Sequence, residues 1–345
     1  MTTPAGHRRR SLIAIETSGG EIECDRVSRR ANLVEGVGVY LLVQAAWWVC
    51  FGSLSRSPGH EWLRVLGVSL IAAAALYALM VAPWLHGDGW HALGFARPME
   101  LVAFCRTHAP GGRRLPLVVL VTVAAFVGLL LLANWDYLLI RLSVRLASPD
   151  TYLALTASPW RGVAMGAAAV ALTAVFAIFG IRWDNLPSAL RAVGGLTVAF
   201  AASIEIAAVA RATLTGDWTT FAGLAWAGST RNGVLVHLAF YTLWAPLQQW
   251  FMLGYFNTRI RKGIAASGRG PASGRVLAAG LTGLAFGALH IPAWPLVAVT
   301  FAGGCAYGWL FQRDRNRNLF VLGLAHGLVG TLLATTTSIR MVVGP

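Results

Sequence analysis

Three short stretches combine polar side chains with long apolar runs, and they hold the residue types that could do chemistry. Gln248 and Gln249 open the first stretch, His290 closes the second and His326 opens the third. Amides and imidazoles can orient a ligand, and an imidazole can also move a proton. Polar groups inside apolar segments are costly in a bilayer and mark functional sites. The sequence therefore predicts a polar centre formed by these four residues.

The composition indicates a membrane protein. Of the 345 residues, 56% are hydrophobic and only 12% are charged, and the mean hydropathy is +0.61. Apolar runs of about 18 to 24 residues recur, and such runs span a bilayer as helices. We expect an all-α polytopic transmembrane bundle. The nine expected spans cover residues 31–54, 62–84, 115–134, 161–180, 188–210, 232–256, 276–291, 294–311 and 318–338.

The net charge of +14 follows from membrane topology, because the basic residues sit in short loops and no nucleic-acid-binding motif is present. With a cytoplasmic N-terminus, 20 of the 28 Lys and Arg residues fall on the cytoplasmic side, which is the side that positive charge favours. We therefore expect no nucleic-acid partner, a lipid bilayer environment and a multi-pass protein of the cell membrane, such as the inner membrane of a bacterium. Residues 135–160 could instead hold an interfacial helix, and a span gained or lost there would invert the second half.

The chain divides into a polar cytoplasmic segment (1–30), an N-terminal transmembrane region (31–231) and a C-terminal transmembrane module (232–345). We expect the polar segment to be poorly ordered and the basic loop 257–275 to be a flexible linker. Pro292 and Pro295 join two short spans and predict a tight helical hairpin. The four cysteines show neither metal-ligand nor disulfide spacing.

Helix rise predicts that the three polar stretches reach a common depth. From the nearest cytoplasmic arginine, Gln248 lies about 16 Å along its span, His290 about 22 Å and His326 about 14 Å. All three values fall in the middle third of a core about 30 Å thick. One shared cluster is compatible with these depths.

The order of the three stretches resembles the CPBP intramembrane proteases, the CAAX prenyl protease and bacteriocin-processing group that is also called Abi. That family carries Glu-Glu-x-x-x-Arg, then Phe-x-x-x-His, then His-x-x-x-Asn on successive spans. Here Phe286 and His290 match the second motif and His326 begins the third. The resemblance covers residues 232–338 and implies an intramembrane endopeptidase in which a glutamate and the histidines activate a water.

The motif residues that differ are those that would carry the chemistry. Gln248 and Gln249 replace the glutamate pair, Leu253 replaces the arginine, and Gly330 replaces the asparagine that helps hold the oxyanion. An amide cannot act as a general base near neutral pH. The changes agree with one another, because a buried arginine without carboxylate partners would be costly. We therefore expect a site that has been neutralised as a unit, as in a pseudoenzyme that binds a peptide, a prenylated ligand, a lipid or a partner helix.

Several alternatives remain open. Glu205 is the most deeply placed carboxylate and could act as a relocated base with His290 and His326 in an active protease. A transporter-like substrate path is a further possibility. Gln248 and Gln249 could simply bond between helices, and His237 could join the other two histidines at a metal. We expect no cofactor, and the sequence does not settle whether a metal is bound.

Overall fold

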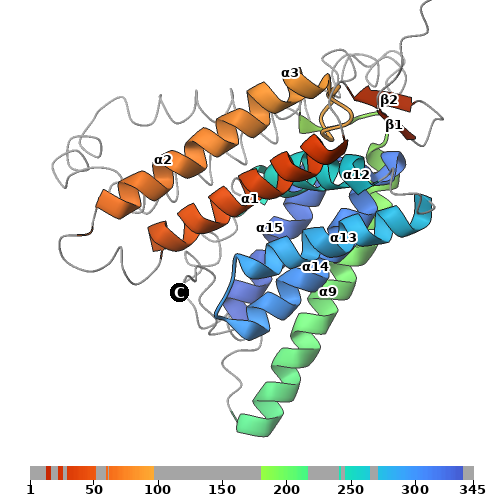
Figure 1. Cartoon of the computed structure of the whole chain (residues 1–345). Helices are drawn as coiled ribbons and strands as arrows, with labels where there is room; N and C mark the ends of the chain where they lie inside the picture. Colours follow the sequence, from red (N-terminus) through yellow and green to blue (C-terminus); the bar gives the residue numbers. More distant parts are fainter. Residues whose placement is uncertain are drawn as a thin grey trace, which may run out of the picture. The chain divides into compact units, whose positions relative to one another are not determined.

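The computed structural model describes residues 13–16, 22–25, 29–51, 60, 62–96, 180–216, 241, 245–264 and 271–336. Most of these residues are helical (Figure 1). The chain forms two compact units. The first contains residues 1–93, 250–315 and 341–345, and the second contains residues 94–249 and 316–340. Each unit is described by itself.

The first unit begins with a pair of long helices. Helix α1 (Arg29–Phe51) packs against α2 (Trp62–Leu76), which continues through the π-helical turn η2 (Tyr77–Val81) into α3 (Ala82–His86). Pro83 lies just after the π turn. Because proline has no N–H group, it breaks the regular helical ladder, and a π turn is one way to accommodate this.

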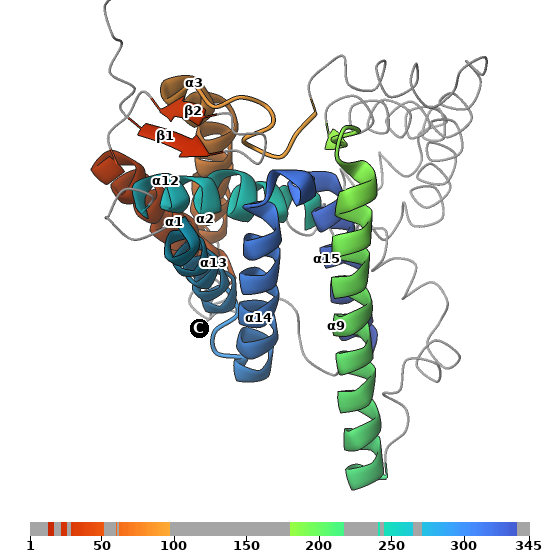
Figure 2. The same ribbon diagram turned by 90° about the vertical axis from the view of Figure 1, so that its right-hand side faces the viewer.

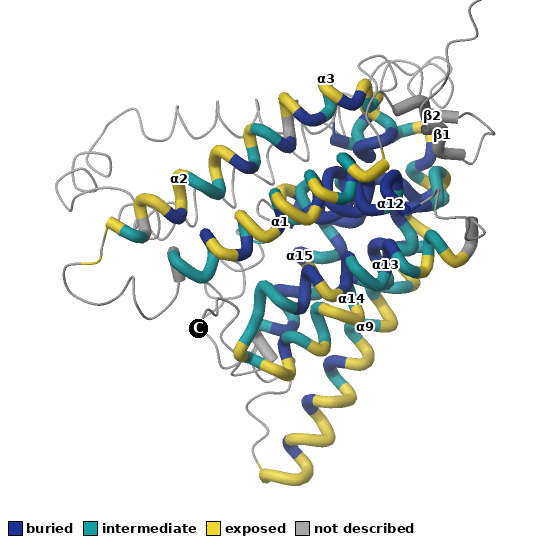
Figure 3. Tube along the Cα trace, viewed as in Figure 1, coloured by how far each residue is buried: buried dark blue, intermediate teal, exposed yellow. Residues whose placement is uncertain are grey.

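The rest of the first unit comes from the C-terminal part of the chain. The π-helical segment η5 (Trp250–Asn257) leads into α12 (Thr258–Ile264). Where the two meet, the Thr258 hydroxyl donates to the carbonyl of Leu253 at 3.3 Å. Helix α12 is almost wholly buried (Figure 3). The prediction of a flexible linker is therefore wrong for residues 258–264, because these residues pack against α1.

Helices α13 (Pro271–Ala288) and α14 (Trp294–Phe311) form the helical hairpin that the sequence predicts, with the short 3₁₀ turn η6 (Asp314–Asn316) after it. A Cβ on Gly283 would lie 2.6 Å from the carbonyl oxygen of Phe301. Glycine there lets the two backbones approach closely. The chain reverses through residues 289–293, where the His290 amide donates to the Gly287 carbonyl at 2.9 Å.

The second unit is built on α9 (Leu186–Thr215), the helical residues 245–249 and α15 (Leu319–Thr336). Helices α9 and α15 lie side by side (Figure 2). Their starts are tied together, because the Asn185 amide donates to the carbonyl of Arg317 at 3.2 Å. The Asn318 amide donates in turn to the Asn185 side chain at 3.1 Å. The two helices therefore begin at a common level.

The helical membrane bundle is confirmed, while the count of nine spans remains a prediction. Within the described residues, three helices are long and apolar enough to cross a membrane: Arg29–Val49, Leu186–Thr215 and Trp294–Phe311. Two shorter apolar helices cover Val65–Leu76 and Leu319–Ala334. The expected span 115–134, the tract 135–160 and residues 161–179 of the following span lie outside the described residues.

The described part of the N-terminal segment contains a short β-hairpin that the sequence analysis did not predict. Strands β1 (Ile13–Glu16) and β2 (Ile22–Asp25) form an antiparallel hairpin in which Ile13 pairs with Asp25. Strand β2 alternates apolar and polar residues, and β1 contributes two isoleucines, a residue type that favours strands. The all-α bundle is confirmed, and this short hairpin is an addition to it in the N-terminal segment.

Candidate functional site

The second unit brings two of the predicted site residues into contact. Gln249 is fully buried at the end of helical residues 245–249, and its Nε2 lies 2.7 Å from Nδ1 of His326 on α15. An amide nitrogen can only donate, so Nδ1 accepts and the ring proton sits on Nε2. In this arrangement the imidazole of His326 is neutral. The pair is a neutral hydrogen-bonded unit where the family motif would hold a glutamate and a histidine.

The Gln249–His326 pair leaves one hydrogen-bonding atom unused. Gln249 Oε1 is shielded from solvent and has no hydrogen-bond partner among the described residues. Exchanging the amide O and N atoms would not remove the problem, because the amide nitrogen would then be the atom without a partner. A buried amide atom without a partner costs free energy that a bound ligand could recover. The pair is therefore able to bind a further polar group.

The helices around the pair approach closely. A Cβ on Gly323 would lie 2.7 Å from Cα of Pro246, so glycine is required where α15 crosses residues 245–249. At Gly330 a Cβ would lie 3.6 Å from the Tyr241 ring and 4.0 Å from the His326 ring, which is ordinary contact. The position that holds asparagine in the family motif thus adjoins the His326 ring and has room for a Cβ.

Gln248 and Leu253, the two remaining motif positions of this segment, lie in different surroundings from Gln249. Gln248 is half-buried and makes no side-chain hydrogen bond to a described residue. Leu253 belongs to the first unit, where it is fully buried within η5. An apolar side chain fits that position, because a cation there would need a carboxylate partner.

His290 lies in the turn between α13 and α14 of the first unit, not inside a helix as the span prediction placed it. The residue is half-buried, but its Nδ1 is shielded from solvent and has no hydrogen-bond partner among the described residues. His290 therefore shares with Gln249 the property of a shielded polar atom that the described protein does not satisfy.

Glu205 lies too far along its helix to share a water with His326. Helices α9 and α15 start together at Asn185 and Asn318 and run in the same direction (Figure 2). From that level Glu205 is 20 residues along α9, about 30 Å, whereas His326 is eight residues along α15, about 12 Å. A general base needs direct or one-water contact. This spacing disfavours Glu205 as a base acting with His326.

His237, the third histidine of the metal alternative, lies outside the described residues. Among the residues that the structure describes, no group of three or more His, Cys, Asp or Glu side chains is arranged to hold a metal ion.

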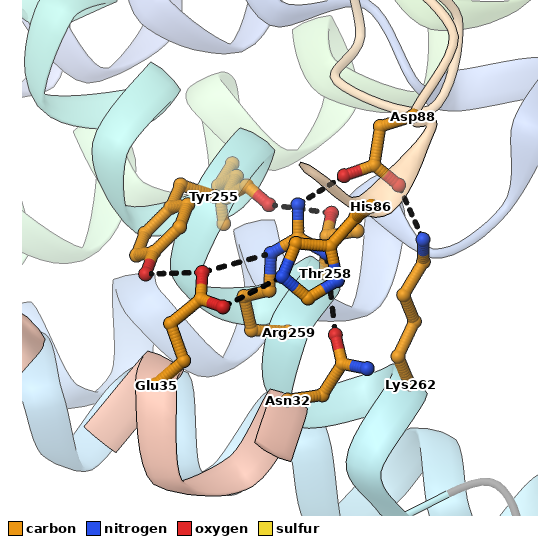
Figure 4. A network of polar contacts seen from close by, with 9 residues as sticks. Asn32, Glu35, His86, Asp88, Tyr255, Thr258, Arg259 and Lys262 are labelled. Carbon is orange, nitrogen blue, oxygen red and sulfur yellow. Dashed lines mark hydrogen bonds and ion pairs between the residues drawn. The ribbon is translucent and has the colours of Figure 1, made fainter. Parts of the chain in front are cut away.

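A second polar centre, which the sequence analysis missed, lies in the first unit (Figure 4). Its anchor is the turn after α3, where Gly87 adopts a left-handed conformation with φ 69°. The amide of Asp88 then bonds back to the carbonyl of Pro83 at 2.9 Å. This C-terminal cap turns the Asp88 carboxylate toward α12. Both oxygens of that carboxylate are used, one by Arg259 and the other by Lys262.

Glu35 of α1 forms the other half of this charged network. Its carboxylate lies 2.6 Å from Nε2 of His86, accepts from the hydroxyl of Tyr255 at 3.0 Å, and lies 3.8 Å from Nε of Arg259. Arg259 also donates to the Asn32 side chain at 3.2 Å. The carboxylates of Glu35 and Asp88 face the cations of Arg259 and Lys262, and His86 adds a further partner for Glu35. The network is therefore compensated within the fold, which is what a buried ionic cluster requires.

The sequence did not predict the network because each of its members, taken alone, has a common explanation. Glu35 lies near the end of the expected span 31–54. Arg259 and Lys262 lie in the expected basic loop 257–275, where positive charge is explained by membrane topology. The available signals were a carboxylate one turn inside a span and an Asp that follows His-Gly at the end of another. Neither signal identifies a partner.

Fold and site together define a helical membrane protein with a neutral polar centre at the motif positions. Residues 230–332 match the family model described as type II CAAX prenyl endopeptidase Rce1-like. The resemblance to the CPBP and CAAX protease family is thereby confirmed for this segment, which is just under a third of the chain. Helices α1 to α3 and α9 lie outside the match. No curated protein and no solved structure matches the chain.

Proposed function

We propose that this protein is a CAAX-type intramembrane endopeptidase homologue that binds a membrane-embedded peptide, such as a prenylated or transmembrane segment, without cleaving it by the family's glutamate-based chemistry. The observation that carries the proposal is the neutral hydrogen bond between Gln249 and His326. It occupies the positions where the family motif would place a general base beside a histidine. We also propose that the protein acts in the cell membrane, with a bacterial inner membrane as the expected setting.

The loss of proteolysis follows from the groups that remain. Proton abstraction from water needs a base that can accept a proton at neutral pH, and an amide cannot do so. The side chain of Gln249 lies 2.7 Å from Nδ1 of His326, so the histidine is paired with an amide and not with a carboxylate that could take up a proton. Leu253 and Gly330 add neither charge nor side-chain donor for a developing oxyanion. The centre can hold a polar group but lacks the means to activate water.

Retained binding is supported by the unsatisfied atoms. Gln249 Oε1 and His290 Nδ1 are both shielded and without a partner among the described residues. A polar group of a bound peptide could supply the missing hydrogen-bond partner of each atom. A purely structural centre would have lost these groups to apolar residues, which are cheaper to bury in a bilayer.

The experiment is a cleavage and binding assay on purified full-length protein in detergent, with farnesylated and transmembrane peptides. The wild type is compared with Gln248→Glu/Gln249→Glu/Leu253→Arg/Gly330→Asn, which restores the family's residue types at all four positions. We expect the wild type to bind peptide without cleaving it and the restored variant to cleave. The control Gln248→Glu/Gln249→Glu/Leu253→Met/Gly330→Asn lacks the compensating arginine and should be less stable than the restored variant.

Cleavage by the wild type would contradict the proposal. The variants Glu205→Gln and His290→Ala then identify the source of activity, because cleavage lost in Glu205→Gln would establish a relocated base. A wild type that neither binds nor cleaves any peptide would also contradict the proposal.

A further inference from the structure

Helix α1 presents one continuous ridge to the part of the chain that matches the protease family. The ridge is made of every fourth residue: Asn32, Gly36, Tyr40, Gln44 and Trp48. Residues four apart are neighbours along a helix, and a row of them forms an inclined ridge that winds slowly around it. The first four members all contact η5, α12 or α13. Asn32 and Gly36 meet α12, Tyr40 meets η5 and α13, and Gln44 meets the end of α13.

The lower part of the ridge is a packing contact. Asn32 bonds to Arg259, and a Cβ on Gly36 would lie 2.8 Å from the Cβ of Arg259. One turn further, the ring of Tyr40 lies 5.1 Å from the ring of Phe256. Helix α1 therefore packs directly against α12 and η5, which belong to the family match, although α1 itself lies outside that match.

The middle of the ridge caps the end of α13. The last carbonyls of a helix have no partner within that helix and need one elsewhere. The Tyr40 hydroxyl lies 2.9 Å from the carbonyl oxygen of Ala285 and 2.7 Å from Oε1 of Gln44. The Gln44 amide donates to the carbonyl of Ala288 at 3.1 Å. Both residues are buried, so two side chains of α1 fix the point at which α13 ends.

The upper end of the ridge is unsatisfied. Trp48 is the next member after Gln44, and its indole Nε1 is shielded from solvent and has no hydrogen-bond partner among the described residues. Because Gln44 contacts Ala288, the residue one turn higher on α1 lies at the level of the turn that follows α13. That turn carries His290, whose Nδ1 is also shielded and unpartnered. Two unused polar atoms thus lie at one level of the first unit.

The chemistry of the two atoms is complementary. An indole N–H group can only donate, whereas Nδ1 of a neutral imidazole protonated at Nε2 can only accept. The ligand that would satisfy both must offer an acceptor and a donor close together and carry no charge. A backbone peptide group does this through its C=O and N–H groups. An acyl chain offers neither, and an anion offers no donor.

We propose that the indole N–H of Trp48 and Nδ1 of His290 bind one peptide group of an extended peptide, so that α1 supplies a peptide-binding subsite that the family match does not include. This inference rests on the proposed function, which requires that the protein bind a peptide. A peptide held extended in a bilayer leaves its backbone groups unsatisfied, and each costs free energy until it finds a partner. The subsite would meet that need.

The test measures binding of a fluorescein-labelled peptide with a C-terminal farnesylcysteine followed by three residues, by anisotropy with the full-length protein in nanodiscs. In a series of probes, each of the last three amide bonds is replaced in turn by an ester, which removes the N–H donor. We expect one ester probe to bind wild type about tenfold more weakly than the amide probe, as the loss of one buried hydrogen bond implies.

The protein variants remove the hydrogen-bonding groups of the protein instead of those of the peptide. Trp48→Phe keeps a ring and removes the N–H donor, and we expect it to weaken binding of the amide probe about tenfold. The control Trp84→Phe removes an indole that is 73% exposed and should bind as wild type. In His290→Ala the sensitive ester probe and the amide probe should bind equally, because the partner of the N–H group is absent.

The outcomes separate the two proposals. If wild type binds the probe but neither the esters nor Trp48→Phe change its affinity by more than about twofold, the subsite is overturned while the proposed function stands. If wild type binds none of the probes, the proposed function is overturned and the subsite with it. The ester series uses unaltered protein, so a variant that fails to fold does not affect it.

Discussion

The charged network of the first unit and the Gln249–His326 pair of the second solve the problem of buried polarity in opposite ways. In the network, Glu35 and Asp88 face Arg259 and Lys262, and both carboxylates have partners at every oxygen. In the pair, nothing is charged and one amide atom has no partner among the described residues. The comparison teaches that charge alone does not mark a site, since a cluster whose carboxylates are fully paired can serve the fold even though Arg259 Nε has no hydrogen-bond partner in the described part of the chain, whereas the neutral pair leaves an amide atom that a ligand could use.

The largest effect is expected from breaking the network at Asp88. Asp88→Ala leaves Arg259 and Lys262 buried without their shared carboxylate, which should destabilise the protein by about 3–5 kcal/mol. Thermal unfolding in detergent measures the loss. The control Asp184→Ala removes a carboxylate that is 42% exposed and pairs with Arg182, and it should cost less than Asp88→Ala because only one cation loses a partner and Arg182 keeps its bond to the Arg317 carbonyl at 3.3 Å. Equal losses in the two variants would contradict the account of the network.

A smaller but still large effect should come from the contact that brings the network together. Gly36→Ala places a Cβ 2.8 Å from the Cβ of Arg259, and relieving that overlap should cost about 1–3 kcal/mol. Gly38→Ala is the matched control on the same helix, because a Cβ there meets nothing within 4 Å. Alanine is the better helix former, so the control should be neutral or slightly stabilising. Equal unfolding temperatures for the two alanine variants would contradict the predicted overlap between Gly36→Ala and Arg259.

The neutral pair should respond differently, with a modest loss of stability and a severe loss of binding. Gln249→Leu removes the hydrogen bond to His326 and also removes the amide atom that has no partner. The two effects partly offset, so stability should fall by about 1 kcal/mol or less. Peptide anisotropy, measured beside thermal unfolding, should show binding reduced by more than tenfold if the pair holds ligand. A variant that loses stability as Asp88→Ala does would indicate a structural pair.

The smallest effect is expected at the cap of α13. Tyr40→Phe removes one buried hydroxyl that serves the carbonyl of Ala285, at a cost of about 0.5–1.5 kcal/mol. The ring remains and keeps its contact with Phe256. Unfolding temperature is again the readout, and Phe251→Leu provides a control for aromatic packing in the same unit. No loss in Tyr40→Phe would mean that the hydroxyl is not needed as a cap.

Local pattern predicted much of the fold and of the family. Apolar run length identified the helices of the membrane region, and Pro292 and Pro295 correctly indicated the α13–α14 hairpin. Motif spacing led to the family that residues 230–332 match. The same reasoning missed the β1–β2 hairpin, because its short strands lie in a segment judged by its polarity alone. It also placed His290 within a span, although α13 ends two residues earlier.

What the sequence by itself determined was therefore local: which residues are helical, which runs are apolar, and which motif positions hold amides and histidines in place of charged groups. Only the tertiary structure decided which polar groups meet. Glu35 and His86 are 51 positions apart, Asp88 and Arg259 are 171 apart, and Gln249 and His326 are 77 apart. The physical reason is that helix periodicity sets which face a side chain occupies, while the identity of the neighbour on that face depends on how distant helices pack.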